Sequence, residues 1–172
     1  RRIKMSINHS KVGGDLTNYP AYIDLSLLGD NFWNKVKNGG GDIRITTSDG
    51  ITECAREIVS CDTTLKTGEV YALIPNVSAS VDTIFYIYYG NPNATDYLAT
   101  DTYGSQAVWG SNAKYVGHFQ GNANDSSSNG NNGNINGPIQ ADGKINKAYN
   151  FINLTSDNIT IPSIDSLFTQ LG

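Results

Sequence analysis

The sequence contains little cysteine, and its only two cysteines are Cys54 and Cys61. On one extended strand these two residues would point to opposite faces and lie roughly 23 Å apart, which is too far for a disulfide. We therefore expect two free, buried thiols. A disulfide made possible by a bulge or loop is one alternative, and metal binding is another, although no Cys-x-x-Cys spacing supports it.

Charge and long apolar runs are also scarce, which excludes two classes of partner. Only 16% of the residues are charged, the net charge is -4, and lysine and arginine are scattered singly after Arg1 and Arg2. A nucleic-acid partner would need a concentrated basic face, so none is expected. No stretch reaches eighteen consecutive apolar residues, so no membrane span is expected either. No signal peptide is visible and the first residue is Arg1, which predicts a processed product or a fragment.

What is present predicts an all-β protein, an antiparallel β-sandwich followed by a second β-unit. Glycine, asparagine, serine and threonine are abundant, and apolar residues alternate with polar ones in several short runs. Asp30 is a plausible N-cap for one short helix, on which Phe32, Trp33 and Val36 share a face. We expect strands within residues 1–10, 22–27, 68–75 and 83–89, and this helix over 30–38.

The most informative stretch is 42–62, DIRITTSDGITECAREIVSCD, which predicts a β-hairpin. Ile43 and Ile45 alternate with polar residues, Ser48-Asp49-Gly50 provides a turn, and Cys54 to Cys61 would form the returning strand. If the numbers of two paired residues add up to about 101, Arg44 lies opposite Glu57. Such a structural pair would contribute roughly 0.2 to 1 kcal/mol.

These residues, together with the segment IYYGN at 87–91, resemble the family catalogued as domain of unknown function 2341. The resemblance covers about residues 1–98 and implies a β-sandwich. The family is found in secreted and surface proteins of bacteria and archaea and in some phage structural proteins, often beside a concanavalin-like module. Ala55, Arg56 and Cys61 depart from its usual second strand, while the DIR, SDG and YYGN elements are intact.

The remainder of the chain is predicted to hold a linker at 99–111 and a second unit at 112–172. Its segments HFQGNANDSSSNGNNG, GKINKAYNF and DNITIP resemble the start of a laminin-G-like, concanavalin A-like jelly roll. Only about 60 residues follow Gly110, fewer than such a domain needs. We therefore expect an incomplete jelly roll, either because the chain is the first portion of a longer protein or because it is a subunit completed in an assembly.

Candidate ligand-binding residues are the aromatic side chains of Trp33, Tyr88, Tyr89 and Trp109. Trp33 has a plainer interpretation as a core residue, because an aromatic side chain on a helix that covers the end of a sandwich is usually part of the core. In the family that the chain resembles, the YYGN segment is structural, which implies that the hydroxyls of Tyr88 and Tyr89 bind the backbone. Asp125, with Asn131 or Asn132, offers hard oxygen ligands for Ca²⁺. The alternative for Asp125 is a solvated turn.

Catalytic patterns are weak, so we predict that the protein is not an enzyme. Glu53 and Glu57 would share one face of a strand, as paired carboxylates of a glycosidase do. However, no aspartate lies between them, and Glu57 is explained by Arg44. His9 and His118 lie in polar contexts, and no Gly-x-Ser-x-Gly motif is present.

The sequence thus predicts a non-enzymatic recognition or adhesion module, secreted, on a cell surface or on a virion, that binds a glycan. One alternative is a structural subunit of a surface filament or phage tail or fibre that contacts neighbouring subunits, including copies of itself. A second alternative is a fragment of a glycoside hydrolase. The glycan hypothesis rests on the resemblance and on the abundance of asparagine, aspartate, glycine and tyrosine.

Overall fold

The computed structural model describes residues 1–143, 146–152 and 156–162. The chain divides into two compact units, Arg1–Gly110 and Ser111–Gly172. Each unit is built from antiparallel strands, as the sequence predicts. Among the described residues, no helix has the length and apolar character needed to cross a membrane.

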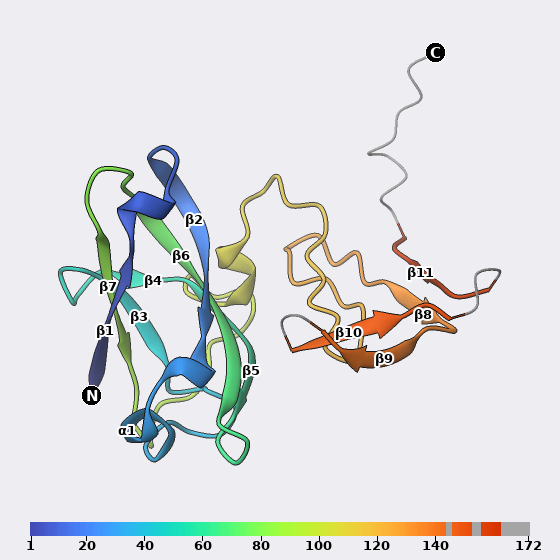
Figure 1. Ribbon diagram of the computed structural model, residues 1–172, viewed down its shortest axis with the longest axis horizontal. Coiled ribbons are helices and arrows are strands. Elements are labelled where there is room, and N and C mark those ends of the chain that lie inside the picture. The colour runs from blue at the N-terminus through green and yellow to red at the C-terminus, as the bar shows by residue number, and fades with distance from the viewer. Residues whose placement is uncertain (144–145, 153–155, 163–172) are drawn as a thin grey trace. The chain divides into compact units, whose positions relative to one another are not determined.

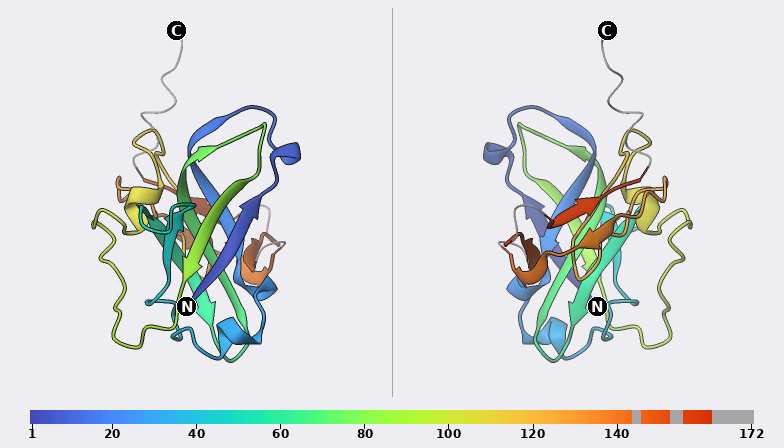
Figure 2. Two further views of the ribbon diagram at one scale, coloured as in Figure 1. Left: turned by 90° about the vertical axis from the view of Figure 1, so that its left-hand side faces the viewer. Right: turned by 90° about the vertical axis from the view of Figure 1, so that its right-hand side faces the viewer.

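The first unit is a β-sandwich of two sheets, which lie to the left and right of the unit in Figure 1. One sheet has the order β1-β7-β3-β4, with bounds Arg2–Ile7, Thr83–Tyr88, Arg44–Thr47 and Glu53–Cys54. The other has the order β2-β6-β5, with bounds Leu16–Asp24, Thr67–Val77 and Arg56–Asp62. Figure 2 shows the same two layers from the sides.

The period-2 pattern of the sequence sets which side chains fill the space between the sheets. On β7, Phe85 and Ile87 are almost fully buried and the alternate residues are partly exposed. On β6, Val70 and Ala72 face the same interior. The core is completed by the apolar residues of the other strands, including Ala21, Ile23, Ile43 and Ile45. Burial of these side chains supplies most of the driving force for the fold.

The helices are short. The predicted helix over 30–38 is a single α-helical turn, α1 (Asp30–Trp33), and Gly29 rather than Asp30 is its N-cap. The expected strand over 22–27 ends early, because the Asp24 carboxylate accepts a hydrogen bond from Ser26 N and starts the 3-10 helix η2 (Leu25–Leu27). Two further 3-10 helices are η1 (His9–Lys11) and η3 (Ser105–Val108).

The predicted hairpin is wrong in its second half. The chain turns at Ser48–Gly50 as expected, but β4 pairs with β3 for only two residue pairs, Ile45 with Cys54 and Thr46 with Glu53. After Ala55 the chain enters the other sheet as β5, which pairs with β6. The numbers of two paired residues across this turn add up to 99, whereas the expected register gives 101, so the pairing is shifted by two residues.

The segment predicted as a linker belongs to the first unit over most of its length. Residues 99–110 lie within Arg1–Gly110, and Val108 of η3 is fully buried. Arg56 N donates a hydrogen bond to Tyr103 O at 3.2 Å, which joins this segment to the start of β5. An apolar side chain buried against the sandwich is the physical reason that these residues are not a linker.

The described residues of the second unit form two short antiparallel pairs. β9 (Ile139–Asp142) pairs with β10 (Lys147–Asn150), and β8 (Asn134–Asn136) pairs with β11 (Asn158–Thr160). Residues 115–119 form no strand, because Val116 N donates to the Asp125 carboxylate and not to a neighbouring strand. The jelly-roll prediction for 112–172 extends over 144–145, 153–155 and 163–172, which lie outside the described residues.

Candidate functional site

An aromatic row crosses the outer face of the β2-β6-β5 sheet and is formed by Tyr22, Tyr71 and Trp109. Tyr22 on β2 pairs directly with Tyr71 on β6, and their ring centroids are 5.5 Å apart with an interplanar angle of 55°. Trp109 follows η3, and its ring centroid lies 5.2 Å from that of Tyr71 at 54°. These distances are typical of favourable tilted aromatic pairs.

Strand alternation explains why the two tyrosines of the row face outward. Tyr22 lies between the buried residues Ala21 and Ile23, so its side chain must point to the opposite face of β2. Tyr71 lies between the buried Val70 and Ala72 in the same way. Tyr22 is 40% exposed, whereas Tyr71 and Trp109 are half-buried.

Three carboxylates accompany the row on this face. Asp24 pairs with Glu69 between β2 and β6, one pleat along from the pair of Tyr22 with Tyr71. Glu57 on β5 lies opposite Tyr71, and its Oε2 accepts a hydrogen bond of 2.7 Å from Trp109 Nε1. Glu57 and Glu69 are only 7% and 5% exposed, and Asp24 Oδ1 accepts hydrogen bonds from Ser26 N and Ser26 Oγ, so all three carboxylates are engaged or buried within the protein.

These carboxylates and burial together raise the pKa values of both tyrosines. Burial is the largest cause of the raised pKa of Tyr22, which reaches about 12, and the charges of Asp24 and Glu69 add to it. Burial also raises the pKa of Tyr71, with further contributions from Glu69 and Glu57. Both phenols are therefore protonated at neutral pH and can donate hydrogen bonds.

The predicted pair of Arg44 with Glu57 is wrong, because the two residues lie on strands of different sheets. Arg44 instead forms an ion pair with Glu53, with 3.6 Å between Nε and Oε1. Glu53 Oε1 also accepts a 2.9 Å hydrogen bond from the hydroxyl of Tyr97, whose ring lies 4.3 Å from the Arg44 guanidinium carbon. Arg44 and Glu53 thus hold Tyr97 against the first sheet.

The same division of β4 and β5 between two sheets argues against the hypothesis that Glu53 and Glu57 form a glycosidase-like pair of carboxylates. Glu53 is on β4 and Glu57 is on β5, so they do not share one face of one strand. Their hydrogen-bond partners differ as well, since Tyr97 contacts Glu53 and Trp109 contacts Glu57.

Of the predicted ligand-binding aromatic residues, Trp33 and Tyr89 are part of the core. Both are nearly buried, and each packs on Phe32 with ring centroids 5.0 Å apart. Tyr88 points to the other face of β7, where its hydroxyl donates a hydrogen bond of 3.1 Å to Gly50 O and so stabilises the turn between β3 and β4. Trp109 is the predicted residue that joins the aromatic row.

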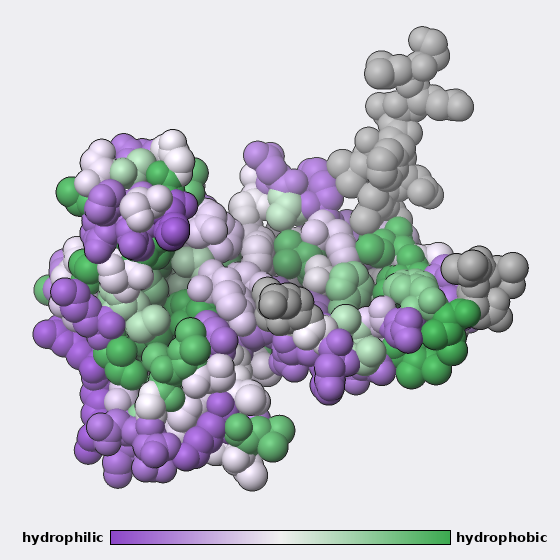
Figure 3. Space-filling model, in the orientation of Figure 1, coloured by the Kyte–Doolittle hydropathy of each residue, from purple (hydrophilic) through white to green (hydrophobic). Residues whose placement is uncertain are grey.

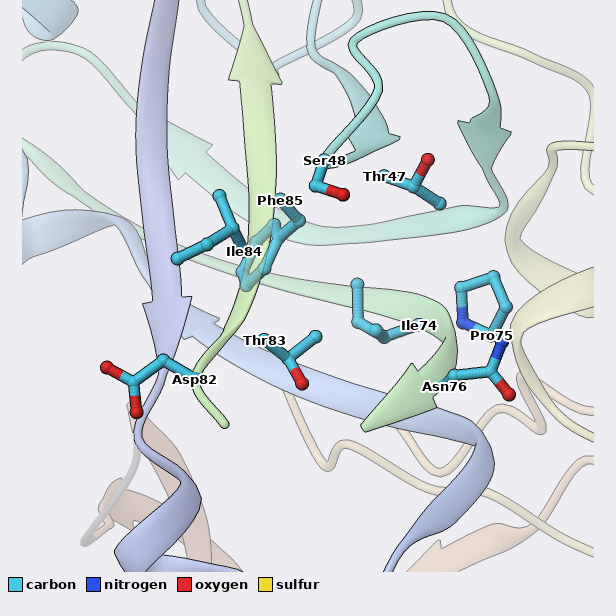
Figure 4. Close-up of a pocket in the computed structure, with 9 residues that line it drawn as sticks. All are labelled: Thr47, Ser48, Ile74, Pro75, Asn76, Asp82, Thr83, Ile84 and Phe85. Atoms are coloured by element: carbon cyan, nitrogen blue, oxygen red, sulfur yellow. The ribbon is translucent and has the colours of Figure 1, made fainter. Parts of the chain in front are cut away.

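A pocket of about 280 Å³ opens where β3 and β6 end and β7 begins. Figure 4 shows Asp82 and Pro75 at its two sides. Its polar groups are largely engaged within the protein: Thr47 Oγ1 donates to Asp49, Thr83 Oγ1 accepts from Ser78 N, and Asp82 contacts His9 Nδ1 at 2.7 Å.

The prediction of calcium at Asp125 does not fit the local geometry. Its carboxylate accepts hydrogen bonds of 2.8–2.9 Å from Val116 N, Ser127 N, Ser127 Oγ and Asn131 N, so donors and not oxygen ligands surround it. Asn132 Oδ1 is engaged by Asp125 N. In the described ranges of the chain, no cluster of three or more histidine, cysteine, aspartate or glutamate residues is arranged to hold a metal ion.

Sequence reasoning missed Tyr22, Tyr71 and Glu69 as members of a site. The alternation of each strand indicated that both tyrosines could face outward. It could not show that they are adjacent, because that depends on the pairing of β2 with β6 across about fifty residues of chain.

Comparison with known protein families gives a match over about half of the chain. A family model with the description "Domain of unknown function (DUF2341)" matches residues 39–131, from the turn before β3 into the second unit. The match therefore starts later and ends later than the expected range of about 1–98. No curated protein and no solved structure matches the chain.

Proposed function

The chain belongs to the DUF2341 family, and because that description assigns no activity, we propose from the site that it is a non-enzymatic carbohydrate-recognition module. The observation that carries this proposal is the aromatic row on the outer face of the β2-β6-β5 sheet, in which Tyr22 is 40% exposed. The apolar C–H faces of sugars stack on aromatic rings, and a tyrosine hydroxyl can exchange hydrogen bonds with sugar hydroxyls.

A flat sheet face suits a saccharide chain better than a small isolated molecule. Small-molecule sites are usually concave and enclose most of the ligand. The aromatic row instead extends across three successive elements, β2, β6 and the residue after η3. A chain of sugar rings can contact all three aromatic side chains while the rest of it remains in solvent. Such binding fits a module that is secreted or displayed on a cell or virion surface.

The test is a glycan array probed with the whole chain and with a Tyr22→Ala variant. Tyr22 is exposed enough for the substitution to leave the fold intact, and loss of its ring should weaken glycan binding about tenfold. Tyr19→Ala is a matched control, because Tyr19 is on the same strand and is 42% exposed, but lies at an odd-numbered position that faces away from the row.

The expected result is a glycan signal that Tyr22→Ala reduces and Tyr19→Ala leaves unchanged. Equal loss in both variants, or no signal with the unmodified chain on any glycan class, would contradict the proposal. Circular dichroism of each variant shows whether the fold is retained.

A second candidate function, a structural subunit in an assembly, is favoured by the surface of the second unit. Ile139, Phe151 and Ile152 are 57%, 46% and 63% exposed. Figure 3 shows apolar surface gathered over the region of β8 and β9. Exposed apolar groups of this kind favour association with another chain. Sedimentation at rising protein concentration should then show self-association that Phe151→Ser weakens, whereas a monomer at every concentration would contradict it.

A further inference from the structure

The pocket of about 280 Å³ is a second place in the first unit where a ligand fits, separate from the aromatic row. It lies between the two sheets, because Thr47 and Phe85 belong to one sheet and Ile74 and Asn76 to the other. The row lies on the outer face of the β2-β6-β5 sheet. A ligand in the pocket would therefore not share the rings of the row.

The early end of β5 leaves this pocket open. β5 pairs with β6 only as far as Ala72, after which Leu73 N donates a hydrogen bond to Ala55 O. β6 continues to Val77, so residues 74–77 lie beside β2 on one side and, in the part of the chain that the structure describes, beside no strand of their own sheet on the other. The opening is thus a consequence of the passage of the chain from one sheet to the other.

The lining is apolar at depth and more polar at the rim, as in many small-molecule sites. Ile74 and Phe85 are nearly buried and form the deep part. Pro75 and Ile84 are partly exposed and extend the apolar surface towards the opening. The volume is at the low end for a ligand site, so it suits one ring and not a chain of rings.

Three polar groups at the rim can bind a ligand. Ser48 and Asn76 are exposed, and neither side chain has a hydrogen bond with another described residue. Thr83 Oγ1 accepts a hydrogen bond from Ser78 N and keeps its own hydrogen for donation. Figure 4 shows Ser48, Asn76 and Thr83 around the space. Two hydroxyls and an amide both donate and accept, which matches the hydroxyl groups of a sugar.

Hydrogen bonds within the protein hold the rim in this shape before any ligand binds. Asp82 Oδ1 accepts from His9 N at 3.0 Å in addition to its contact with the His9 ring, and the bond from Ser78 N to Thr83 Oγ1 is also 3.0 Å long. A site that is already formed needs little ordering when the ligand enters, so less of the binding free energy is lost.

A peptide strand added beside β6 is the alternative occupant, and Pro75 argues against it. Leu73 directs its N–H to this side of β6, and the residue two positions further along a strand points its N–H in the same direction. That residue is Pro75, which has no N–H. The edge therefore lacks the donor with which a further strand would pair.

We propose that the pocket binds a single sugar ring, the terminal residue of a saccharide, whose apolar face lies against Pro75 and Ile84. The hydroxyl groups of the ring bind Ser48, Asn76 and Thr83. This inference extends the proposed carbohydrate recognition to a second site, and it does not depend on the aromatic row.

Heteronuclear NMR of the whole ¹⁵N-labelled chain, titrated with free monosaccharides, tests this proposal. The panel is glucose, galactose, mannose, N-acetylglucosamine and fucose. At least one should shift the side-chain amide signal of Asn76 and the backbone signals of Ser48 and Thr83, with a dissociation constant on the order of 1 mM. Cyclohexanemethanol, a six-membered ring with a single hydroxyl, should bind at least about tenfold more weakly.

The matched variants are Asn76→Ala with Asn93→Ala, and Ser48→Ala with Ser80→Ala. Each pair removes the same group at an exposed position, once at the rim and once outside the pocket. Asn76→Ala and Ser48→Ala should each weaken binding of the selected monosaccharide about three- to tenfold, and the two controls should leave it unchanged. The NMR spectrum of each variant shows whether the fold is retained.

The outcomes separate this inference from the proposed function. If no monosaccharide of the panel shifted these signals, or if cyclohexanemethanol bound as tightly as the best sugar, the proposed sugar pocket would be overturned, whatever Tyr22→Ala does on the glycan array. Shifts along the β6 edge with an extended peptide and none with sugars would overturn it in favour of strand addition. Saturable sugar shifts that Asn76→Ala weakens would support the pocket even if Tyr22→Ala left the array signal unchanged and the aromatic row were excluded.

Discussion

Arg56 shows at the residue scale how a charge can be part of a sandwich core. It is 1% exposed, its Nε donates to Ile43 O, and its Nη2 forms a 2.8 Å ion pair with Asp96. Burial lowers the pKa of Arg56, and the charge of Asp96 opposes that effect. A buried guanidinium is tolerated because its donors are satisfied.

Removal of Asp96 tests this arrangement. Asp96→Ala should lower the free energy of unfolding by about 1–3 kcal/mol, because a buried donor of Arg56 loses its acceptor. Asp96→Asn retains an oxygen acceptor without the charge and should fall between wild type and Asp96→Ala. Urea unfolding measures both, and an unchanged midpoint for Asp96→Ala would show that Arg56 does not depend on Asp96.

Individual residues also show which contacts could be predicted from the sequence and which could not. Burial of Trp33 was anticipated, because an aromatic residue on a helix that covers a sandwich is usually part of the core, and the hydroxyl of Tyr88 binds the backbone as the family resemblance implies. The contacts of Glu53 with Tyr97 and of Glu57 with Trp109 were not predictable, because both aromatic residues come from far along the chain. Both cysteines are free and buried, as expected.

At the scale of elements, the turn between β3 and β4 is stabilised by one carboxylate. Asp49 accepts hydrogen bonds from Ile51 N at 2.8 Å, Thr52 N at 2.9 Å and Thr47 Oγ1 at 2.8 Å, and a further one from Thr52 Oγ1. Gly50 has a φ of 72°, which glycine adopts without strain. The sequence Ser-Asp-Gly was sufficient to predict this turn.

The same hydrogen bonds, that with Thr52 Oγ1 foremost, hold the pKa of the Asp49 carboxyl well below its usual range. A depressed pKa stabilises the fold fully above the unfolded value of about 4, and this contribution is lost as the pH falls towards the folded value. We expect Asp49→Asn to be less stable at pH 7 and to lose less stability between pH 4 and pH 2. Thermal unfolding across this range measures the effect, and parallel curves for the two proteins would contradict it.

Local periodicity does not reveal that the returning strand of the predicted hairpin is divided into β4 and β5. Cys54, Ala55, Arg56 and Glu57 are four consecutive buried residues, which neither face of a single half-exposed strand explains. A short run of buried residues is ambiguous between a central strand and a change of sheet. Pairing with β6, some fifteen residues later, decides between them.

For the whole molecule, the boundary between the units follows packing and not composition. Residues 99–110 have the polar, irregular composition of a linker, yet Val108 is fully buried and Trp109 contacts Glu57. The DUF2341 match also continues past residue 98, to 131. The sandwich itself was predictable from its alternating strands, whereas this covering segment was not, because its one apolar anchor is flanked by turns.

Two shortened chains test this boundary. A chain of residues 1–98 should be less stable than one of residues 1–110 by about 1.5–3 kcal/mol, the value for full burial of one apolar side chain. Urea midpoints of the two proteins give the difference. A Val108→Ala variant of the longer chain should lie between them, and equal stability of the two lengths would show that residues 99–110 contribute nothing to the first unit.

The passage from β4 to β5 takes place through Ala55 alone, between Cys54 in one layer and Arg56 in the other. Adding or deleting one residue there would move the core-facing side chains of β5 to the outer face of the sheet and the outer ones to the core, since successive side chains of a strand point to opposite faces. Natural relatives should therefore keep the interval from Arg44 to Glu57 constant in length. Insertions and deletions should instead accumulate in the exposed turn at 63–66, where a change of length does not move strand side chains from one face of a sheet to the other.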